Sequence, residues 1–254
     1  MFNRFSSISV AIAAFAVLSF ASLTWAVDIE CPIIADTLLA GHSSENDTNS
    51  GARESLRVKG YQGIVVFRFD MSPAQGFTIE GGTFSVYCRG VGGGGAVGTT
   101  NSDGISTIAH DWIEGTGDYT VDADSATFLW PGAALGDTWG DQNNDGLARY
   151  GEIDVLDVIN GFGGSVANSQ GAWDFTVDQR TDVELDAAVV QALVDGQYGI
   201  AVLRDNTSVN LDLASREWQD GANAATLIVH AADASAVDPG GKLASTWGIL
   251  KSVR

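Results

Sequence analysis

The chain has 254 residues, of which 13 are Lys or Arg and 32 are Asp or Glu, so its formal net charge at pH 7 is −19. A protein that binds nucleic acid by neutralising phosphates needs a cationic face, and this charge balance excludes that class. Hydrophobic residues make up 45% of the chain, which is enough for a core, and the 31 glycines are typical of a β protein with many turns.

The N-terminal segment has the pattern of a secretory signal peptide. Arg4 precedes an apolar run over residues 8–23, and Thr24 and Ala26 are small residues at the positions that determine cleavage. We therefore expect residues 1–26 to be removed and the mature protein to be secreted or held at the cell surface. The alternative is a membrane anchor, because the run approaches the roughly 20 residues of a spanning helix. No second apolar span follows, so no transmembrane segment is expected after signal removal.

Two cysteines, Cys31 and Cys88, lie in the expected mature chain. An exported protein meets oxidising conditions, so the sequence predicts a disulfide between them. Such a bond closes a ring of about 57 residues and stabilises the fold by about 4 kcal/mol. The alternative is two buried thiols.

From residue 33 onward, short apolar or alternating runs are separated by Gly, Asn, Asp and Ser, which is typical of strands. The expected strands are residues 33–39, 55–59, 63–70, 83–89, 106–112, 127–130, 173–177, 198–204 and 226–231. One short helix is expected at residues 186–193. Strands that recur without alternating helices predict an all-β fold, an antiparallel β-sandwich of jelly-roll type.

The expected strands at residues 63–70 and 83–89 alternate between apolar and polar residues. In the first, Phe67 and Phe69 share one face while Arg68 lies on the other, so one face is expected in the core. The glycines of residues 90–98 predict a loop between strands. A phosphate-binding loop is the alternative, although no Lys-Ser/Thr pair follows.

The most specific motif is a twelve-residue loop over residues 141–152, which fits the calcium-binding pattern D-x-N-x-D-G-x5-E at every required position. Oxygens at positions 1, 3, 5, 7 and 12 converge on the cation, and Gly at position 6 permits the sharp turn. The expected calcium ligands are Asp141, Asn143, Asp145, the Leu147 carbonyl and Glu152. The alternative is an ordinary acidic turn.

A short amphipathic helix is expected directly after this loop, over residues 153–162, but no helix is expected before it. A loop with only an exiting helix looks like half of a dockerin. We expect residues 137–171 to form a calcium-loop-plus-helix insertion in the sandwich, with calcium as the cofactor.

Motifs for catalysis are absent or weak. The chain has no G-x-S-x-G, and His42, His110 and His230 do not have metal-ligand spacing. The best acid–base cluster is His110 with Asp111 and Glu114, which suits a small polysaccharide lyase or hydrolase. The alternative is a polar strand end.

Arginine is preferred over lysine, and Arg57, Arg68, Arg89 and Arg204 lie inside expected strands. A guanidinium binds a carboxylate through two parallel hydrogen bonds. Such arginines either hold Asp or Glu partners on a half-buried face or bind a carboxylate ligand such as a uronic acid. Tryptophans that are exposed can stack on sugar rings. The candidates are Trp112, Trp130, Trp139, Trp173 and Trp218, and the alternative is that they pack in the core or between the sheets.

A series of short motifs occurs in a defined order along the chain. They are Ala35-Asp36-Thr37, Ser55-Leu56-Arg57-Val58, Val66-Phe67-Arg68-Phe69-Asp70, Trp112-Ile113-Glu114-Gly115, residues 189–196, Tyr198-Gly199-Ile200 and Ala214-Ser215-Arg216-Glu217. Over residues 33–231 this set resembles the DNRLRE-domain family, which is related to the alginate-binding family 96 carbohydrate-binding modules. The resemblance implies a secreted, non-catalytic jelly-roll sandwich that in some members binds acidic polysaccharide, with Arg57, Arg68 and Arg216 as the ligand-binding residues.

The sequence therefore predicts a β-sandwich over residues 33–231 and a tail over residues 232–254, which is either an attachment peptide or a disordered end. We expect a non-catalytic module that binds carbohydrate, with a uronate-containing polysaccharide as ligand, or that mediates surface adhesion. Two alternatives stay open. One is a structural or assembly protein that docks a protein partner through the calcium loop, and the other is the small lyase or hydrolase.

Overall fold

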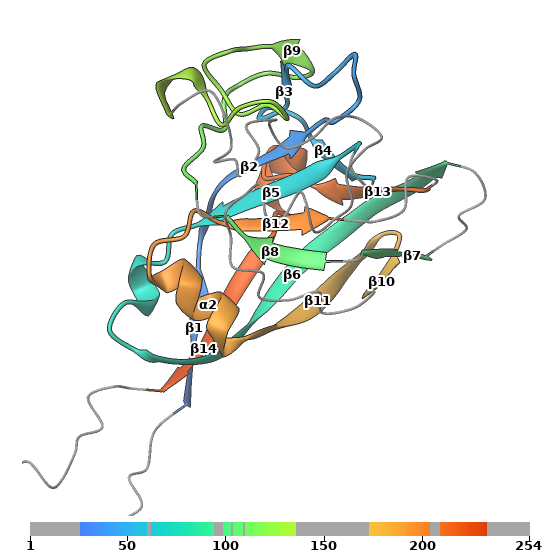
Figure 1. Cartoon of the computed structure of the whole chain (residues 1–254). Helices are drawn as coiled ribbons and strands as arrows, with labels where there is room; N and C mark the ends of the chain where they lie inside the picture. Colours follow the sequence, from blue (N-terminus) through green and yellow to red (C-terminus); the bar gives the residue numbers. More distant parts are fainter. Residues whose placement is uncertain are drawn as a thin grey trace, which may run out of the picture. The chain divides into compact units, whose positions relative to one another are not determined.

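Antiparallel strands form two facing sheets in the computed structural model of the chain (Figure 1). The structure describes residues 26–59, 62–93, 99–102, 104–108, 110–135, 173–203 and 209–232. The predicted all-β antiparallel sandwich is confirmed, whereas its jelly-roll connectivity stays a prediction. The predicted insertion at residues 137–171, the predicted signal peptide up to residue 25 and the tail beyond residue 232 lie outside the described residues.

The larger sheet has six strands, and the long strand β6 pairs with three of the others. The strands are β1 (Ala26–Cys31), β14 (Thr226–Ala232), β6 (Thr78–Gly93), β13 (Val209–Ala214), β4 (Ser55–Val58) and β11 (Gln179–Asp186). Strands β14 and β11 both pair with β6 at Thr83, so they lie on opposite edges of β6. Strand β13 continues the β14 edge farther along β6 and has β4 on its other side.

The second sheet has four strands in the order β2, β5, β12 and β8. Their bounds are β2 (Ile33–Leu39), β5 (Ile64–Phe69), β12 (Ile200–Leu203) and β8 (Gly104–Thr107). Two small sheets pair β10 (Trp173–Thr176) with β7 (Thr99–Ser102) and β3 (Thr48–Asn49) with β9 (Thr120–Val121).

The helical elements are short. Within the described residues they are the 3-10 turns η1 (Ser72–Ala74), η2 (Ala133–Leu135) and η3 (Trp218–Gly221) and the helix α2 (Ala187–Val194). Helix α2 lies within one residue of the predicted helix, and it lies at the opposite end of the sandwich from β3 and β9 (Figure 1). Across the described ranges, the structure has no helix with the length and apolar character needed to cross a membrane.

The main core lies between the two large sheets. Phe67 and Phe69 of β5 are in edge-to-face contact with Phe84 of β6, with ring centroids 5.4 and 6.1 Å apart. The predicted alternation is confirmed, because Phe67 and Phe69 are buried in this core while Arg68 between them is only partly buried on the other face. The aromatic contacts thus join the two sheets at their centre.

A second core covers the outer face of the four-stranded sheet. Val66 of β5 contacts this core, and Trp112 and Phe128 come from the segment that follows β8. Strand β5 is therefore buried on both faces, which explains the unbroken apolar run Ile-Val-Val-Phe at its start. The strand predicted at residues 127–130 is wrong, because that segment is a turn closed by a hydrogen bond from the Thr127 N–H to the Trp130 carbonyl.

The other differences from prediction are shifted strand ends and strands that were not predicted, which are β1, β3, β7, β9, β11 and β13. The predicted strand at residues 83–89 is part of a longer β6 that continues through Gly93, so the loop predicted at residues 90–98 begins later. Strand β1, which lies before the predicted start of the sandwich at residue 33, pairs with β14 along its whole length.

The predicted disulfide between Cys31 and Cys88 is wrong, since both are free, buried thiols. Cys31 is opposite Leu227 of β14, and Leu227 is opposite Phe84 of β6. Cys88 is four residues farther along β6, so the two cysteines are about 10 Å apart across the strands and about 13 Å apart along them. A disulfide requires a Cα separation below about 7 Å.

Candidate functional site

Three charged side chains project from the outer face of the six-stranded sheet, away from the main core. Arg57 lies between the buried residues Leu56 and Val58 on β4, so it points to the opposite face. By the same alternation, Asp212 of β13 points outward from between two buried leucines. Arg89 of β6 follows the buried Cys88 and also faces outward.

Strand pairing brings these charges side by side. Arg57 and Asp212 are direct partners in the β4–β13 register. On the other side of β13, Asp212 is opposite Gly90, and the register shifts between Asp212 and Leu213. A Cβ built at Gly90 would lie 3.9 Å from Asp212 Oδ2, so the Asp212 carboxylate lies next to Gly90, which has no side chain.

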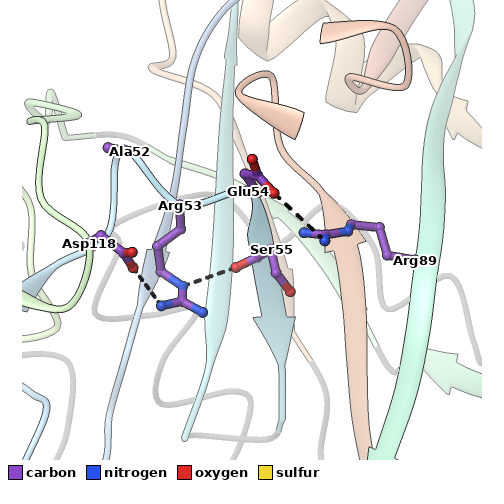
Figure 2. A pocket seen from close by; sticks show the side chains of 6 residues that line it. All are labelled: Ala52, Arg53, Glu54, Ser55, Arg89 and Asp118. Carbon is purple, nitrogen blue, oxygen red and sulfur yellow. Dashed lines mark hydrogen bonds and ion pairs between the residues drawn. The ribbon is translucent and has the colours of Figure 1, made fainter. Parts of the chain in front are cut away.

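A hollow of about 410 Å³ lies beside this charged row. Figure 2 shows two ion pairs on either side of Ser55, which starts β4. In one, Arg53 Nη1 is 2.6 Å from Asp118 Oδ1, and Arg53 Nε also donates to the Ser55 carbonyl at 3.2 Å. In the other, Arg89 Nη2 is 4.0 Å from Glu54 Oε2, which is too long for a hydrogen bond.

Each of the three arginines lies over an aromatic ring. The guanidinium carbon of Arg53 lies 4.0 Å from the centroid of the Tyr119 ring, and that of Arg57 lies 5.9 Å from it. The guanidinium carbon of Arg89 lies 4.8 Å from the Trp218 ring. We call Arg53, Arg57 and Arg89, with Tyr119 and Trp218, the arginine surface. It contains half of the six arginines in the described part of the chain.

The electrostatics of the arginine surface centre on Asp212. Burial raises the pKa of its carboxyl above the usual range, while Arg57, Arg89 and Arg53 act in the opposite direction without cancelling the effect. A hydrogen bond with the Ser55 side chain also favours the charged form. Asp212 is therefore a half-buried carboxylate that interacts electrostatically with all three arginines.

Arg68, a predicted ligand-binding residue, lies on the other sheet and is held by its neighbours. Its Nη2 donates to Asp111 Oδ1 at 2.6 Å and to the Trp112 carbonyl at 2.8 Å. Its Nε donates to the Tyr198 carbonyl at 3.3 Å, and its guanidinium lies 4.6 Å from the Trp112 ring. These contacts fix the loop that follows β8 onto β5.

Arg216, the third predicted residue, is bound by both carboxylate oxygens of Glu114, with Nε 2.9 Å from Oε1. The backbone N–H of Arg216 donates to Asp36 Oδ2 at 2.9 Å. Asp36 is fully buried, and its Oδ1 has no hydrogen-bond partner. Burial, with Glu217 and Glu114 nearby, raises the pKa of Asp36 from 3.8 to about 8.

The three predicted arginines thus each hold a carboxylate, since Arg57 Nη2 donates to Glu45 Oε2 at 2.9 Å. Only Arg57 belongs to the arginine surface. The sequence reasoning did not single out Arg53, Asp212 or Tyr119, because their proximity depends on strand register. Arg89 and Trp218 were recognisable as a strand arginine and an aromatic candidate.

The residues of the predicted acid–base cluster lie within these networks. Asp111 holds Arg68 and Glu114 holds Arg216. His110 is partly buried beside Asp111. Both carboxylates therefore have structural partners.

The predicted calcium ligands, Asp141, Asn143, Asp145, Leu147 and Glu152, lie outside the described residues. Within the residues that are described, His, Cys, Asp and Glu side chains do not form a group of three or more suited to holding a metal ion. Calcium binding therefore stays a prediction for residues 141–152.

Comparison of the chain with models of known protein families finds no match, and comparison with characterised proteins also finds none. The resemblance to the DNRLRE-domain family rests on the sequence motifs.

Proposed function

We propose that this protein is a secreted, non-catalytic module that binds an acidic polysaccharide at the arginine surface. The observation that supports this proposal most directly is that Arg53, Arg57 and Arg89 lie close together at the outer face of one sheet in a protein with a net charge of −19. Cations are scarce in this chain, so three of them on one face mark the place where an anion would bind.

The chemistry of the hollow suits a carboxylate-bearing sugar. A guanidinium presents a planar fork that matches a carboxylate, and neighbouring aromatic rings give a sugar ring an apolar surface. Glu54 and Asp118 already pair with the arginines, but their side chains are 64% and 67% exposed. Exposed ion pairs contribute at most about 1 kcal/mol, so a ligand carboxylate can replace them.

Arg68 and Arg216 fit a structural role better than a ligand-binding role. Each makes several hydrogen bonds to carboxylate or carbonyl oxygens that tie distant segments together. The same pairs occupy Asp111 and Glu114, the carboxylates on which a lyase or hydrolase would depend. This arrangement favours a binding module over an enzyme.

The test is the binding of oligogalacturonate by the full mature chain, measured by calorimetry, with an uncharged galactose oligomer as the control ligand. We expect weak, salt-sensitive binding to the acidic oligomer. Arg89→Gln should reduce this binding at least about tenfold, because a bidentate contact to a charged group is lost. Arg180→Gln is the matched control, since it removes the same charge from β11 outside the hollow. Equal binding of both oligomers, or no effect of Arg89→Gln, would contradict the proposal.

A further inference from the structure

Asp212 occupies the position in the arginine surface that a ligand carboxylate would otherwise take. It is the direct register partner of Arg57, and all three arginines of the surface attract it. Its carboxylate lies over Gly90, where β6 has no side chain to separate it from Arg89. An anion that approaches the arginines therefore meets a negative charge already in place.

The other carboxylates at this surface differ from Asp212 in their freedom to move. Glu54 and Asp118 are exposed, and Glu45, which pairs with Arg57, is 33% exposed. Asp212 lies within a paired strand and is partly buried between β4 and β6. The side chains of Glu54, Asp118 and Glu45 can turn toward solvent when a ligand binds. The Asp212 side chain stays beside the arginines, and only protonation removes its charge.

The groups that face Asp212 come from every neighbouring element. Strand β4 supplies Arg57 and the Ser55 side chain, and the segment before β4 supplies Arg53. Strand β6 supplies Arg89. The Cys88 thiol lies on the inner face of β6, and burial raises its pKa to about 11, so it stays neutral. Tyr119 also interacts with Asp212, and burial raises the pKa of its hydroxyl. The other nearby carboxylates act on neighbours of Asp212: Glu45 pairs with Arg57, Glu54 with Arg89 and Asp118 with Arg53, while Asp178 lies near Cys88.

We propose that Asp212 is a built-in competitor for the anionic ligand, so that the arginine surface binds acidic polysaccharide more tightly when Asp212 is protonated. This inference rests on the proposed function and adds a regulation to it. Charged Asp212 offsets positive charge on the arginines in addition to the three exposed or half-exposed carboxylates, and its protonation removes that competing negative charge. Because linkage is reciprocal, ligand binding favours the protonated carboxyl and takes up a proton.

The direction of the pH effect follows from this competition. Burial raises the pKa of Asp212, so protonation begins at milder acidity than for an exposed aspartate. Uronate carboxylates remain charged above about pH 5, so the ligand itself does not titrate in this range. Binding should therefore strengthen as the pH is lowered toward about 5, above which the ligand stays fully charged.

The decisive variant is Asp212→Asn, which keeps the shape of the side chain and an oxygen for Ser55 but removes the charge. We expect it to bind oligogalacturonate about tenfold more tightly than the wild type near pH 8, and to lose most of the pH dependence. Calorimetry in two buffers of different ionisation enthalpy should show proton uptake on binding by the wild type and less by the variant.

Asp186→Asn is the matched control, because it removes the same charge at the end of β11, where the Asp186 side chain makes no capping hydrogen bond to α2. It should bind like the wild type. If Asp212→Asn binds with wild-type affinity and pH dependence while both proteins bind the oligomer, the competitor role is wrong and the proposed function stands. If neither protein binds at either pH, the proposed function is wrong, and the role of Asp212 falls with it. Thermal unfolding of each variant confirms that it is folded.

Discussion

Glu114 binds the guanidinium of Arg216 through both of its carboxylate oxygens, across 102 positions of sequence. One of these oxygens also accepts the backbone N–H of Asp36 at 2.7 Å. A single carboxylate thus connects β2, the loop after β8 and the segment after β13. The Glu114 side chain is 14% exposed, so solvent weakens this contact less than it weakens the ion pairs at the rim of the hollow.

Glu114→Gln should lower the free energy of unfolding by about 2 kcal/mol, because a charge-assisted double hydrogen bond becomes a single neutral one. Urea unfolding measures the change. Asp118→Asn is the control. The Asp118 side chain also pairs with an arginine, Arg53, but it is 67% exposed. We expect that control to lose less than about 1 kcal/mol. Equal losses in the two variants would show that Glu114 has no special role.

The buried Asp36 predicts a pH-dependent stability. Its pKa is about 8 in the folded protein against an ordinary 3.8, so the folded state holds a proton that the unfolded state releases between these values. The stabilising contribution is complete below about pH 4 and is lost as the pH rises toward about 8, at about 1.4 kcal/mol per pH unit.

Asp36→Asn removes this titration. The stability of the variant relative to the wild type should therefore increase as the pH is raised from about 4 to about 8, as measured by urea unfolding across that range. Asp118→Asn is the control variant, because this side chain is 67% exposed. Parallel pH profiles for Asp36→Asn and the wild type would mean that Asp36 is ionised in the folded protein at neutral pH.

Asn49 connects three backbone segments from a fully buried position on β3. Its Nδ2 donates to the carbonyls of Glu114 and Ala126 at 2.6 and 2.9 Å, and its Oδ1 accepts the Gly117 N–H at 2.8 Å. Asn49→Asp places a carboxylate oxygen against two carbonyls, and we expect a loss of about 3 kcal/mol in denaturant unfolding.

The control for Asn49 is Asn223→Asp, because the Asn223 side chain makes only one exposed hydrogen bond, to Gln219. Its stability should stay within about 0.5 kcal/mol of the wild type. A small effect at both positions would show that water replaces the buried hydrogen bonds of Asn49.

Calcium provides a prediction that rests on sequence alone. Titration of calcium into chelator-treated protein should give saturable heat and raise the melting temperature, with an affinity in the range of extracellular calcium sites, about 10⁻⁴ to 10⁻³ M. Asp145→Ala should abolish both effects. Absence of heat in the wild type would reduce residues 141–152 to an acidic turn.

The sequence predicted several strands whose inward residues are strongly apolar, although it missed β13, in which Leu211 and Leu213 are buried. Strands β2 and β5 and helix α2 match their predicted positions closely. Strand β11 was not predicted, because its outward-facing residues are charged and only Val183 and Leu185 are buried. The segment at residues 127–130 was wrongly predicted to be a strand. It is a turn that packs on the outer face of the four-stranded sheet, and apolar character alone does not distinguish such a segment from a strand within a sheet.

The arginine surface depends on tertiary pairing that no local pattern encodes. Arg57 meets Asp212 because β4 pairs with β13, and Arg89 joins them at the irregularity in the β13–β6 register. A shift of one residue in either pairing would turn these side chains toward the core. The type of residue was therefore predictable from the sequence, whereas the grouping was not.

The pairing of β1 with β14 has a mechanical consequence. Ala26 and Ala232 are register partners, so the first and last described residues of this unit lie opposite each other at one end of a strand pair. Tension applied between these two residues acts perpendicular to the strands and loads one hydrogen-bonded pair at a time, as in a zipper. Under a pulling force, β1 should therefore peel away from its neighbour toward Cys31 while the phenylalanine contacts between the two sheets still hold.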